Sequence, residues 1–158
     1  MTEPAKHRGG APVGYLSDLD VVEAAAVLYL RLWSGGPDRQ AQMWADLSRV
    51  LGPDAGRQAL QAFEQICTLC AHHGRRPLMR HSLRCRCLGA DECCFANFIA
   101  AASDGELEDA MLIATMIVRA DVAPGLVGLA ETFGLALKRV ALRDPSGPPD
   151  RPSSKTLH

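Results

Sequence analysis

The stretch that decides the fold runs from Pro53 to Gly74 and reads PDAGRQALQAFEQICTLCAHHG. Its apolar residues recur at spacings of three and four, at Ala59, Leu60, Phe63, Ile66, Cys67 and Cys70. This spacing places them on one face of an α-helix. Pro53 suits the first turn of a helix, and Gly74 suits the left-handed position that often ends one. The sequence therefore predicts a helix that starts at Pro53 and stops at Gly74.

Similar start and stop signals lie on both sides of this helix. The expected neighbours are a first helix capped by Ser17 or Asp18 and ended by Gly35, a second from Pro37 to Gly52, a fourth capped by Asp91, a fifth with a capping box at Ser103 and Glu106 that runs to about Ala120, and a sixth from Pro124 to about Leu142. Alanine and leucine, which favour helices, greatly outnumber valine, isoleucine and threonine. We expect an all-α fold, a compact bundle of five or six helices.

Proline and glycine are concentrated at both ends of the chain. Residues 1–15 and 143–158 are therefore predicted to be unstructured tails, with a single helical domain over residues 16–142. Residues 75–90 are predicted to be a loop between the third and fourth helices. A loop of this length inside a small domain is usually functional or disordered.

The composition also bears on location and partners. The chain has no early apolar run of signal-peptide length, so we expect a cytoplasmic protein with reduced thiols. The longest strongly apolar stretch, Ala110 to Val118, is too short to span a membrane. It is apolar on nearly every side, which predicts either a central helix or half of a homodimer interface formed by the fifth or sixth helix. The net charge of -1 gives no general attraction to nucleic acid or anionic lipid.

All six cysteines lie between Cys67 and Cys94. Cys67 and Cys70 would share a helix face, and Cys85 and Cys87 would point to the same side of an extended loop. Two such pairs can supply the four thiolates of a tetrahedral zinc site. His81 and Cys93 are substitute ligands, giving a second candidate set of His81, Cys85, Cys87 and Cys93. An iron–sulfur cluster could use the same thiolates.

The same window is rich in arginine. It contains Arg75, Arg76, Arg80, Arg84 and Arg86, and no acid lies between residue 65 and Asp91. This charge is expected to lower the pKa of nearby thiols and to suit an acidic protein partner at the loop from Arg75 to Arg86. Nucleic acid is not expected, because no aromatic residue for base stacking lies in the window before Phe95. Asp91 and Glu92 are interpreted as acids that favour the start of a helix.

Two other functions are compatible with these residues. A redox enzyme or switch could cycle Cys67 and Cys70 between dithiol and disulfide, with His73 as proton acceptor. The helical Cys-Thr-Leu-Cys resembles carboxymuconolactone decarboxylase-like peroxidases, in which a histidine follows four residues after the second cysteine; here that residue is Gly74. Alternatively, the cysteines are incidental core residues of an interaction or adaptor protein. The favoured hypothesis is a small zinc-binding protein with a structural, sensing or regulatory role, rather than an enzyme.

Overall fold

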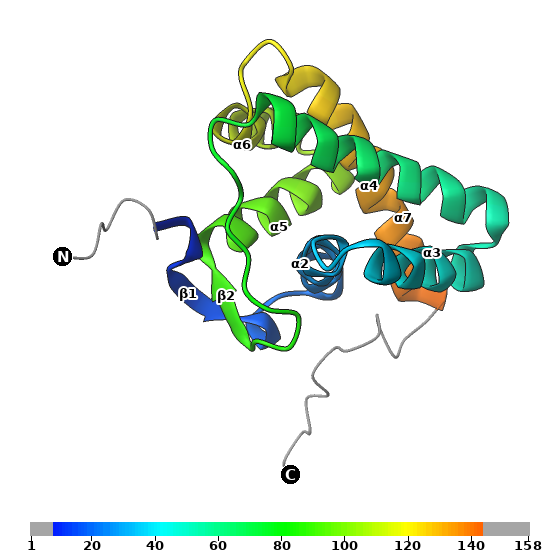
Figure 1. The fold of residues 1–158 in the computed structure, drawn as a ribbon. Coiled ribbons are helices and arrows are strands. Elements are labelled where there is room, and N and C mark those ends of the chain that lie inside the picture. The colour runs from blue at the N-terminus through cyan, green and yellow to red at the C-terminus, as the bar shows by residue number, and fades with distance from the viewer. Residues whose placement is uncertain (1–7, 144–158) are drawn as a thin grey trace.

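The computed structural model describes residues 8–143, which form a compact bundle of six α-helices with a two-stranded sheet at one edge (Figure 1). The elements are η1 (Arg8–Gly10), β1 (Pro12–Tyr15), η2 (Leu16–Asp18), α2 (Val21–Trp33), α3 (Pro37–Leu51), α4 (Pro53–His73), β2 (Cys87–Gly89), α5 (Ala90–Ser103), α6 (Leu107–Ile117) and α7 (Ala123–Arg143). The predicted all-helical bundle is confirmed.

The helix boundaries follow local signals, with some corrections. Helices α3 and α4 begin at prolines, and Gly36 and Gly52 before them have φ values of 91° and 87°. Helix α2 is capped by Asp20, whose side chain accepts a hydrogen bond from the Glu23 amide at 2.8 Å. Gly74 ends α4 in an extended conformation, with φ of -65°, so the left-handed stop predicted there is wrong.

The capping box predicted at Ser103 and Glu106 does not form at the start of α6. Ser103 is the last residue of α5, and its hydroxyl donates to the Ala100 carbonyl at 2.9 Å. Helix α6 ends at Ile117, short of the predicted Ala120. Leu112 and Met116 are 66% and 68% exposed. Helix α6 therefore lies at the surface of the bundle, and of the two predicted roles only an interface remains open for it.

Aromatic side chains join the helices at the centre of the core. The ring of Phe63 on α4 lies 6.5 Å from that of Phe95 on α5 and 4.8 Å from that of Phe133 on α7, measured between centroids. Tyr29 on α2 meets Phe133 edge-on at 6.4 Å. All four residues are buried. These contacts fix α2, α4, α5 and α7 relative to one another. The loop that follows α4 leads through β2 to α5, so the positions of these two helices also fix where the loop starts and where it ends.

The N-terminal segment is the main departure from the predicted organisation. Residues 8–15 form η1 and β1 rather than a tail, and β1 pairs antiparallel with β2, with Tyr15 opposite Cys87. The predicted loop over residues 75–90 accordingly ends in a strand. A four-residue strand containing proline and glycine carries no alternating pattern, and its partner lies far along the chain. The rest of the predicted tails, residues 1–7 and 144–158, lies outside the described residues.

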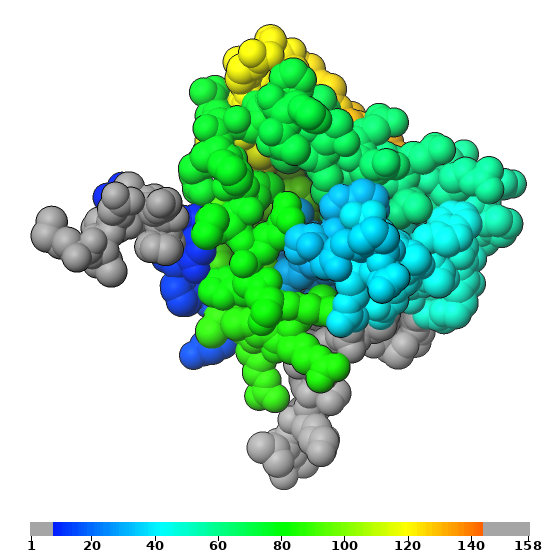
Figure 2. Space-filling model, in the orientation of Figure 1, coloured from blue at the N-terminus to red at the C-terminus, as the bar shows by residue number. Residues whose placement is uncertain are grey.

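The segment between α4 and β2 runs over the surface of the bundle. In Figure 2 it is the green band between the blue N-terminal segment and the cyan α3. Its first residues join the end of α6, because the Arg75 amide donates to the Ile117 carbonyl at 2.9 Å. Within the described part of the chain, no helix has the length and apolar character needed to cross a membrane. We call the segment from Gly74 to Arg86 the connecting loop.

Candidate functional site

A buried ion pair between Arg31 on α2 and Glu92 on α5 lies beneath the connecting loop. The Arg31 Nε donates to Glu92 Oε2 at 2.6 Å, and Nη2 donates to Oε1 at 2.9 Å. Both side chains are 0% exposed. Charged groups are rarely buried unless they are paired, and the two parallel hydrogen bonds make this a strong, directional pair.

Arg31 also holds the backbone of the loop and of β2. Its Nη1 donates to the carbonyls of Ser82 at 3.1 Å and Cys85 at 2.6 Å, and Nη2 donates to the Cys87 carbonyl at 2.7 Å. A guanidinium has five N–H donors, and all five are used in this arrangement. The arginine therefore acts as a template on which an otherwise irregular segment is fixed.

Glu92 holds the same segment from the other side. Its carboxylate accepts hydrogen bonds from the amides of Gly89 at 3.0 Å and His81 at 3.3 Å. Burial alone raises the pKa of Glu92, but the hydrogen bonds from Arg31 and Gly89 and the positive charge of Arg31 outweigh it, so its pKa lies below the usual 4.5. The predicted role of Glu92 at the helix start is thus real, since Gly89 is the N-cap, but it is only part of its function.

A second ion pair fastens the start of the loop to α5. Arg76 donates to both carboxylate oxygens of Asp91, at 2.7 and 2.5 Å, and the Met79 amide donates to the same carboxylate at 2.7 Å. Gly9 packs directly on this pair, because a Cβ atom there would lie 2.1 Å from Asp91 Oδ2. The predicted N-cap role of Asp91 is wrong, since Asp91 lies inside the first turn of α5 and binds the loop instead.

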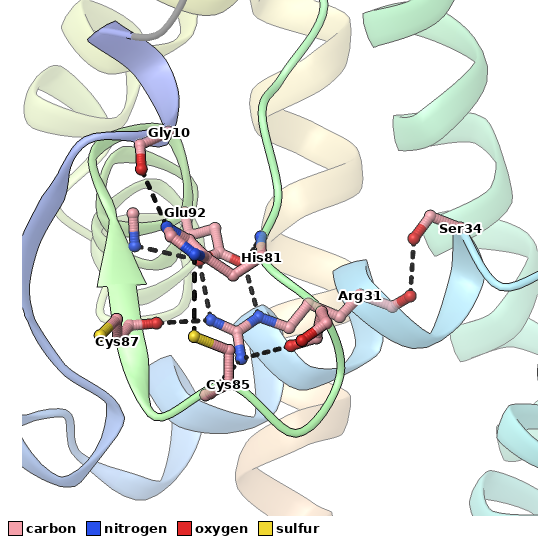
Figure 3. A network of polar contacts seen from close by, with 9 residues as sticks. Gly10, Arg31, Ser34, His81, Cys85, Cys87 and Glu92 are labelled. Atoms are coloured by element: carbon pink, nitrogen blue, oxygen red, sulfur yellow. Dashed lines mark hydrogen bonds and ion pairs between the residues drawn. The ribbon is translucent and has the colours of Figure 1, made fainter.

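His81 and Cys85 face one another within the connecting loop (Figure 3). The Cys85 Sγ lies 3.8 Å from His81 Nδ1, and His81 Nε2 lies 2.9 Å from the carbonyl oxygen of Gly10. Both side chains are half-buried. The imidazole thus connects the Cys85 thiol to the N-terminal segment. Gly89 leaves room for the ring, because a Cβ atom there would lie 2.9 Å from His81 Cδ2.

The predicted thiol pair on α4 has a different character. Cys67 and Cys70 are half-buried near the helix end and pack against the core. Burial raises the pKa of Cys67 to about 12 and that of Cys70 to about 11, although Arg80 acts in the opposite direction on both. Burial also raises the pKa of Cys94. The expectation that arginines would lower the pKa of these thiols is therefore wrong, because desolvation of the thiolate dominates.

The predicted metal ligands are not gathered around one point. Within residues 8–143, no three side chains of histidine, cysteine, aspartate or glutamate form a group that could hold a metal ion. In Figure 3 the Cys85 sulfur faces His81, whereas the Cys87 sulfur points to the outside of β2. Cys93 accepts a hydrogen bond from the Asn97 side chain at 3.6 Å. Of the six predicted ligands, which all lie within residues 8–143, only His81 and Cys85 are in hydrogen-bonding contact with each other, and the zinc hypothesis stays a prediction.

His73, the predicted proton acceptor for Cys67 and Cys70, has another partner. Its Nδ1 accepts a hydrogen bond from Arg119 at 3.2 Å, and its carbonyl accepts one from the Arg119 amide at 3.1 Å. The histidine is therefore part of a link between the end of α4 and the turn after α6. This contact gives His73 a structural role, and its role as proton acceptor for Cys67 and Cys70 stays a prediction.

Sequence reasoning missed Arg31 and the Gly10 carbonyl. Arg31 lies in the apolar run LYLRLW, and a charge on a helix face that is otherwise buried is a usable signal for a buried ion pair. Nothing in the sequence indicates that Glu92 is its partner or that Gly10 binds His81, because 61 and 71 residues separate the members of these contacts.

Comparison with known proteins finds no matching family model, no significantly similar curated protein and no significantly similar solved structure.

Proposed function

We propose that this protein is a cytoplasmic thiol-based regulatory protein in which Cys85, paired with His81, is the responsive group. The observation that carries the proposal is the approach of Cys85 Sγ to His81 Nδ1 at 3.8 Å, while His81 Nε2 is held by the Gly10 carbonyl. A cysteine next to a histidine that is oriented by a third group is the usual arrangement of an activated thiol. All six cysteines are free, which suits a reducing compartment.

The Gly10 contact determines which imidazole nitrogen carries the proton. A carbonyl oxygen can only accept a hydrogen bond, so His81 Nε2 must donate. In neutral imidazole the other nitrogen then has a lone pair, and we assign Nδ1 as the acceptor for the Cys85 thiol. Transfer of that proton to Nδ1 leaves a thiolate next to an imidazolium. The thiolate is the nucleophilic form of cysteine.

We expect the N-terminal segment, residues 8–15, to be the part of the protein that changes when Cys85 is modified. His81 contacts Cys85 on one side and Gly10 on the other, and Gly10 precedes the strand β1 that pairs with β2. A group added to the Cys85 sulfur would compete with His81 for space and would weaken its bond to Gly10. We therefore expect modification of Cys85 to loosen residues 8–15 while the helical core remains folded.

The test is the alkylation rate of each cysteine in the native protein at pH 7, measured with iodoacetamide and mass spectrometry. Cys85 should react faster than Cys67, Cys70 and Cys94. His81→Ala should slow Cys85 by about tenfold, because an unassisted thiol is only a few per cent ionised at pH 7 and the thiolate is the form that reacts. His72→Ala, which changes an exposed histidine on α4, is the matched control and should leave the rate unchanged.

Two results would overturn the proposal: a Cys85 rate no faster than that of Cys67, or equal Cys85 rates in His81→Ala and His72→Ala. If His81→Ala also disorders the loop, the rate for Cys85 should still fall, but only to that of an unassisted free thiol. His81→Gln, which can keep a donor to Gly10 but cannot accept a thiol proton in the same way, then supplies the second variant. Hydrogen exchange of residues 8–15, measured before and after alkylation, tests whether modification of Cys85 loosens this segment. Exchange there should become faster.

Zinc binding is a second candidate function, favoured by the same pair. An imidazole nitrogen and a thiol sulfur that face each other at 3.8 Å are two suitable ligands for one zinc ion. Cys67, Cys70, Cys87 and Cys93 are the proposed sources of the remaining ligands, and the loop would have to rearrange to bring them to His81 and Cys85. An iron–sulfur cluster would require the same rearrangement.

Elemental analysis and an absorption spectrum of protein purified under reducing conditions test this candidate. About one zinc per chain, lost in Cys85→Ser and retained in Cys94→Ser, would support it. Visible charge-transfer bands would indicate iron–sulfur ligation instead. Protein that is metal-free and does not take up added zinc would exclude the zinc candidate and would leave the thiol proposal standing.

A further inference from the structure

Resting on the proposed role of Cys85, we infer that its reaction partner is a small disulfide carrying negative charge, such as one bearing two carboxylates. Cys85 lies between Arg84 and Arg86, and both arginine side chains are exposed. Two exposed cations on the residues next to Cys85 would attract an anionic reactant to this part of the surface and repel a cationic one. The charge of the reactant, rather than its shape, is then the property that the site selects.

These arginines are not neutralised by the acids that approach the loop. Asp91 is paired with Arg76, and Glu92 is paired with Arg31. Asp18, on the neighbouring η2, accepts a hydrogen bond from the Tyr15 amide. Among residues 8–143, no acid forms an ion pair with Arg84 or Arg86, so their charges are available to a ligand.

The Cys85 backbone is fixed, its side chain is half-buried, and the flanking arginine side chains are exposed. Arg31 holds the carbonyls of Ser82, Cys85 and Cys87, and this holds the chain on both sides of the thiol. The Leu16 amide also donates to the Arg86 carbonyl at 2.9 Å. A reactant therefore meets a thiol and an imidazole that are already in place, with two exposed cations on the neighbouring residues of the chain.

The reaction would be thiol–disulfide exchange. Cys85 passes its proton to His81 Nδ1, and the thiolate attacks one sulfur of the disulfide. A bond forms between Cys85 Sγ and that sulfur, the original S–S bond breaks, and the departing thiolate takes up the proton from His81. The protein thiol is oxidised to a mixed disulfide, and half of the reactant is reduced to a free thiol. No other oxidant is needed.

Three small disulfides of similar size separate charge from other factors: dithiodipropionate with two negative charges, bis(2-hydroxyethyl) disulfide with none, and cystamine with two positive charges. The rate of adduct formation at Cys85 is followed by mass spectrometry. Each rate is divided by the rate for a small uncharged thiol, which removes the intrinsic reactivity of the disulfide. We expect the normalised rate for the dianion to exceed that for the dication by about tenfold or more, and the difference to shrink at high salt.

A matched pair of double variants tests whether Arg84 and Arg86 cause the preference for the dianion. Arg84→Gln with Arg86→Gln should abolish most of the preference for the dianion. Arg57→Gln with Arg139→Gln removes the same charge from exposed positions on α4 and α7 and should preserve it. Equal normalised rates for all three disulfides, or a preference that survives loss of Arg84 and Arg86, would overturn this inference while Cys85 remains a reactive thiol. A Cys85 that reacts with none of the three faster than Cys67 would overturn the proposed function itself.

Discussion

Arg31 donates a hydrogen bond from Nη1 to the backbone carbonyl of Cys85 at 2.6 Å. This contact joins the buried ion pair of the core to the residue that we propose as the responsive thiol. Because the same guanidinium also binds Glu92, the position of Cys85 depends on a charge pair that has no exposed side-chain surface. Stability of the bundle and reactivity of the loop should therefore respond together to changes at this pair.

Arg31→Met should be strongly destabilising. It leaves the Glu92 carboxylate buried without its cation and removes the donors to three backbone carbonyls. Breaking a buried ion pair by removing one partner typically costs about 3–5 kcal/mol. Urea denaturation measures the loss in the free energy of unfolding. Arg57→Met, at an exposed position on α4, is the control, and an equal effect of the two substitutions would contradict the role given to Arg31.

Glu92 should make stability fall at acidic pH. Its pKa in the folded protein lies below the usual 4.5, so the folded state favours the ionised form. The stabilisation is fully present above the unfolded pKa and is lost as the pH falls through the folded pKa. Unfolding free energies from pH 7 downward should therefore decline below about pH 5. Glu92→Gln should flatten that decline, whereas Glu64→Gln on the exposed face of α4 should not.

Cys67 and Cys70 should be slow to react in the native protein. Since burial raises their pKa values to about 12 and about 11, few of these thiols are ionised at pH 8. Alkylation at both residues should accelerate as the pH rises toward 10, and unfolding in urea should remove the protection. Rapid formation of a Cys67–Cys70 disulfide under mild oxidation would contradict this expectation and revive a redox role for the α4 pair.

Gly89→Ala should lower the reactivity of Cys85 while leaving the helices folded. The added Cβ would lie 2.9 Å from His81 Cδ2, so the ring must move away from its place between Cys85 and Gly10. We expect slower alkylation of Cys85 with little loss of helical structure by circular dichroism. Gly128→Ala on α7 is the control, because a Cβ there meets no atom within 4 Å. Unchanged Cys85 reactivity in Gly89→Ala would argue against the imidazole as proton acceptor.

The exposed apolar face of α6 predicts a homodimer. Leu112 and Met116 are its most exposed apolar residues, and Leu107 is half exposed. Light scattering should give a mass of twice the 17.0 kDa chain, and Met116→Lys should reduce it to that of one chain. Val21→Lys, on α2, introduces the same charge elsewhere and should leave the mass unaltered. A wild-type protein with the mass of a single chain would exclude this interface.

The cysteines show how much of the candidate site can be predicted from the sequence alone. The sequence places all six cysteines in one window and predicts that Cys85 and Cys87 point to the same side of an extended loop. It could not indicate that Cys85 meets His81 while Cys87 points to the outside of β2. Side-chain direction in an irregular segment depends on what holds the backbone, and Arg31 supplies that from another helix.

The sequence by itself determined the helices, since proline starts, glycine stops and three-and-four apolar spacing act within one segment of chain. Only the tertiary structure decided the candidate site: the Arg31–Glu92 pair, the link from His81 to Gly10, and the pairing of β1 with β2. Each joins segments distant in sequence, whose meeting depends on packing of the whole core. Burial likewise reversed the expected effect of the arginines on Cys67 and Cys70, because desolvation is a property of the folded state.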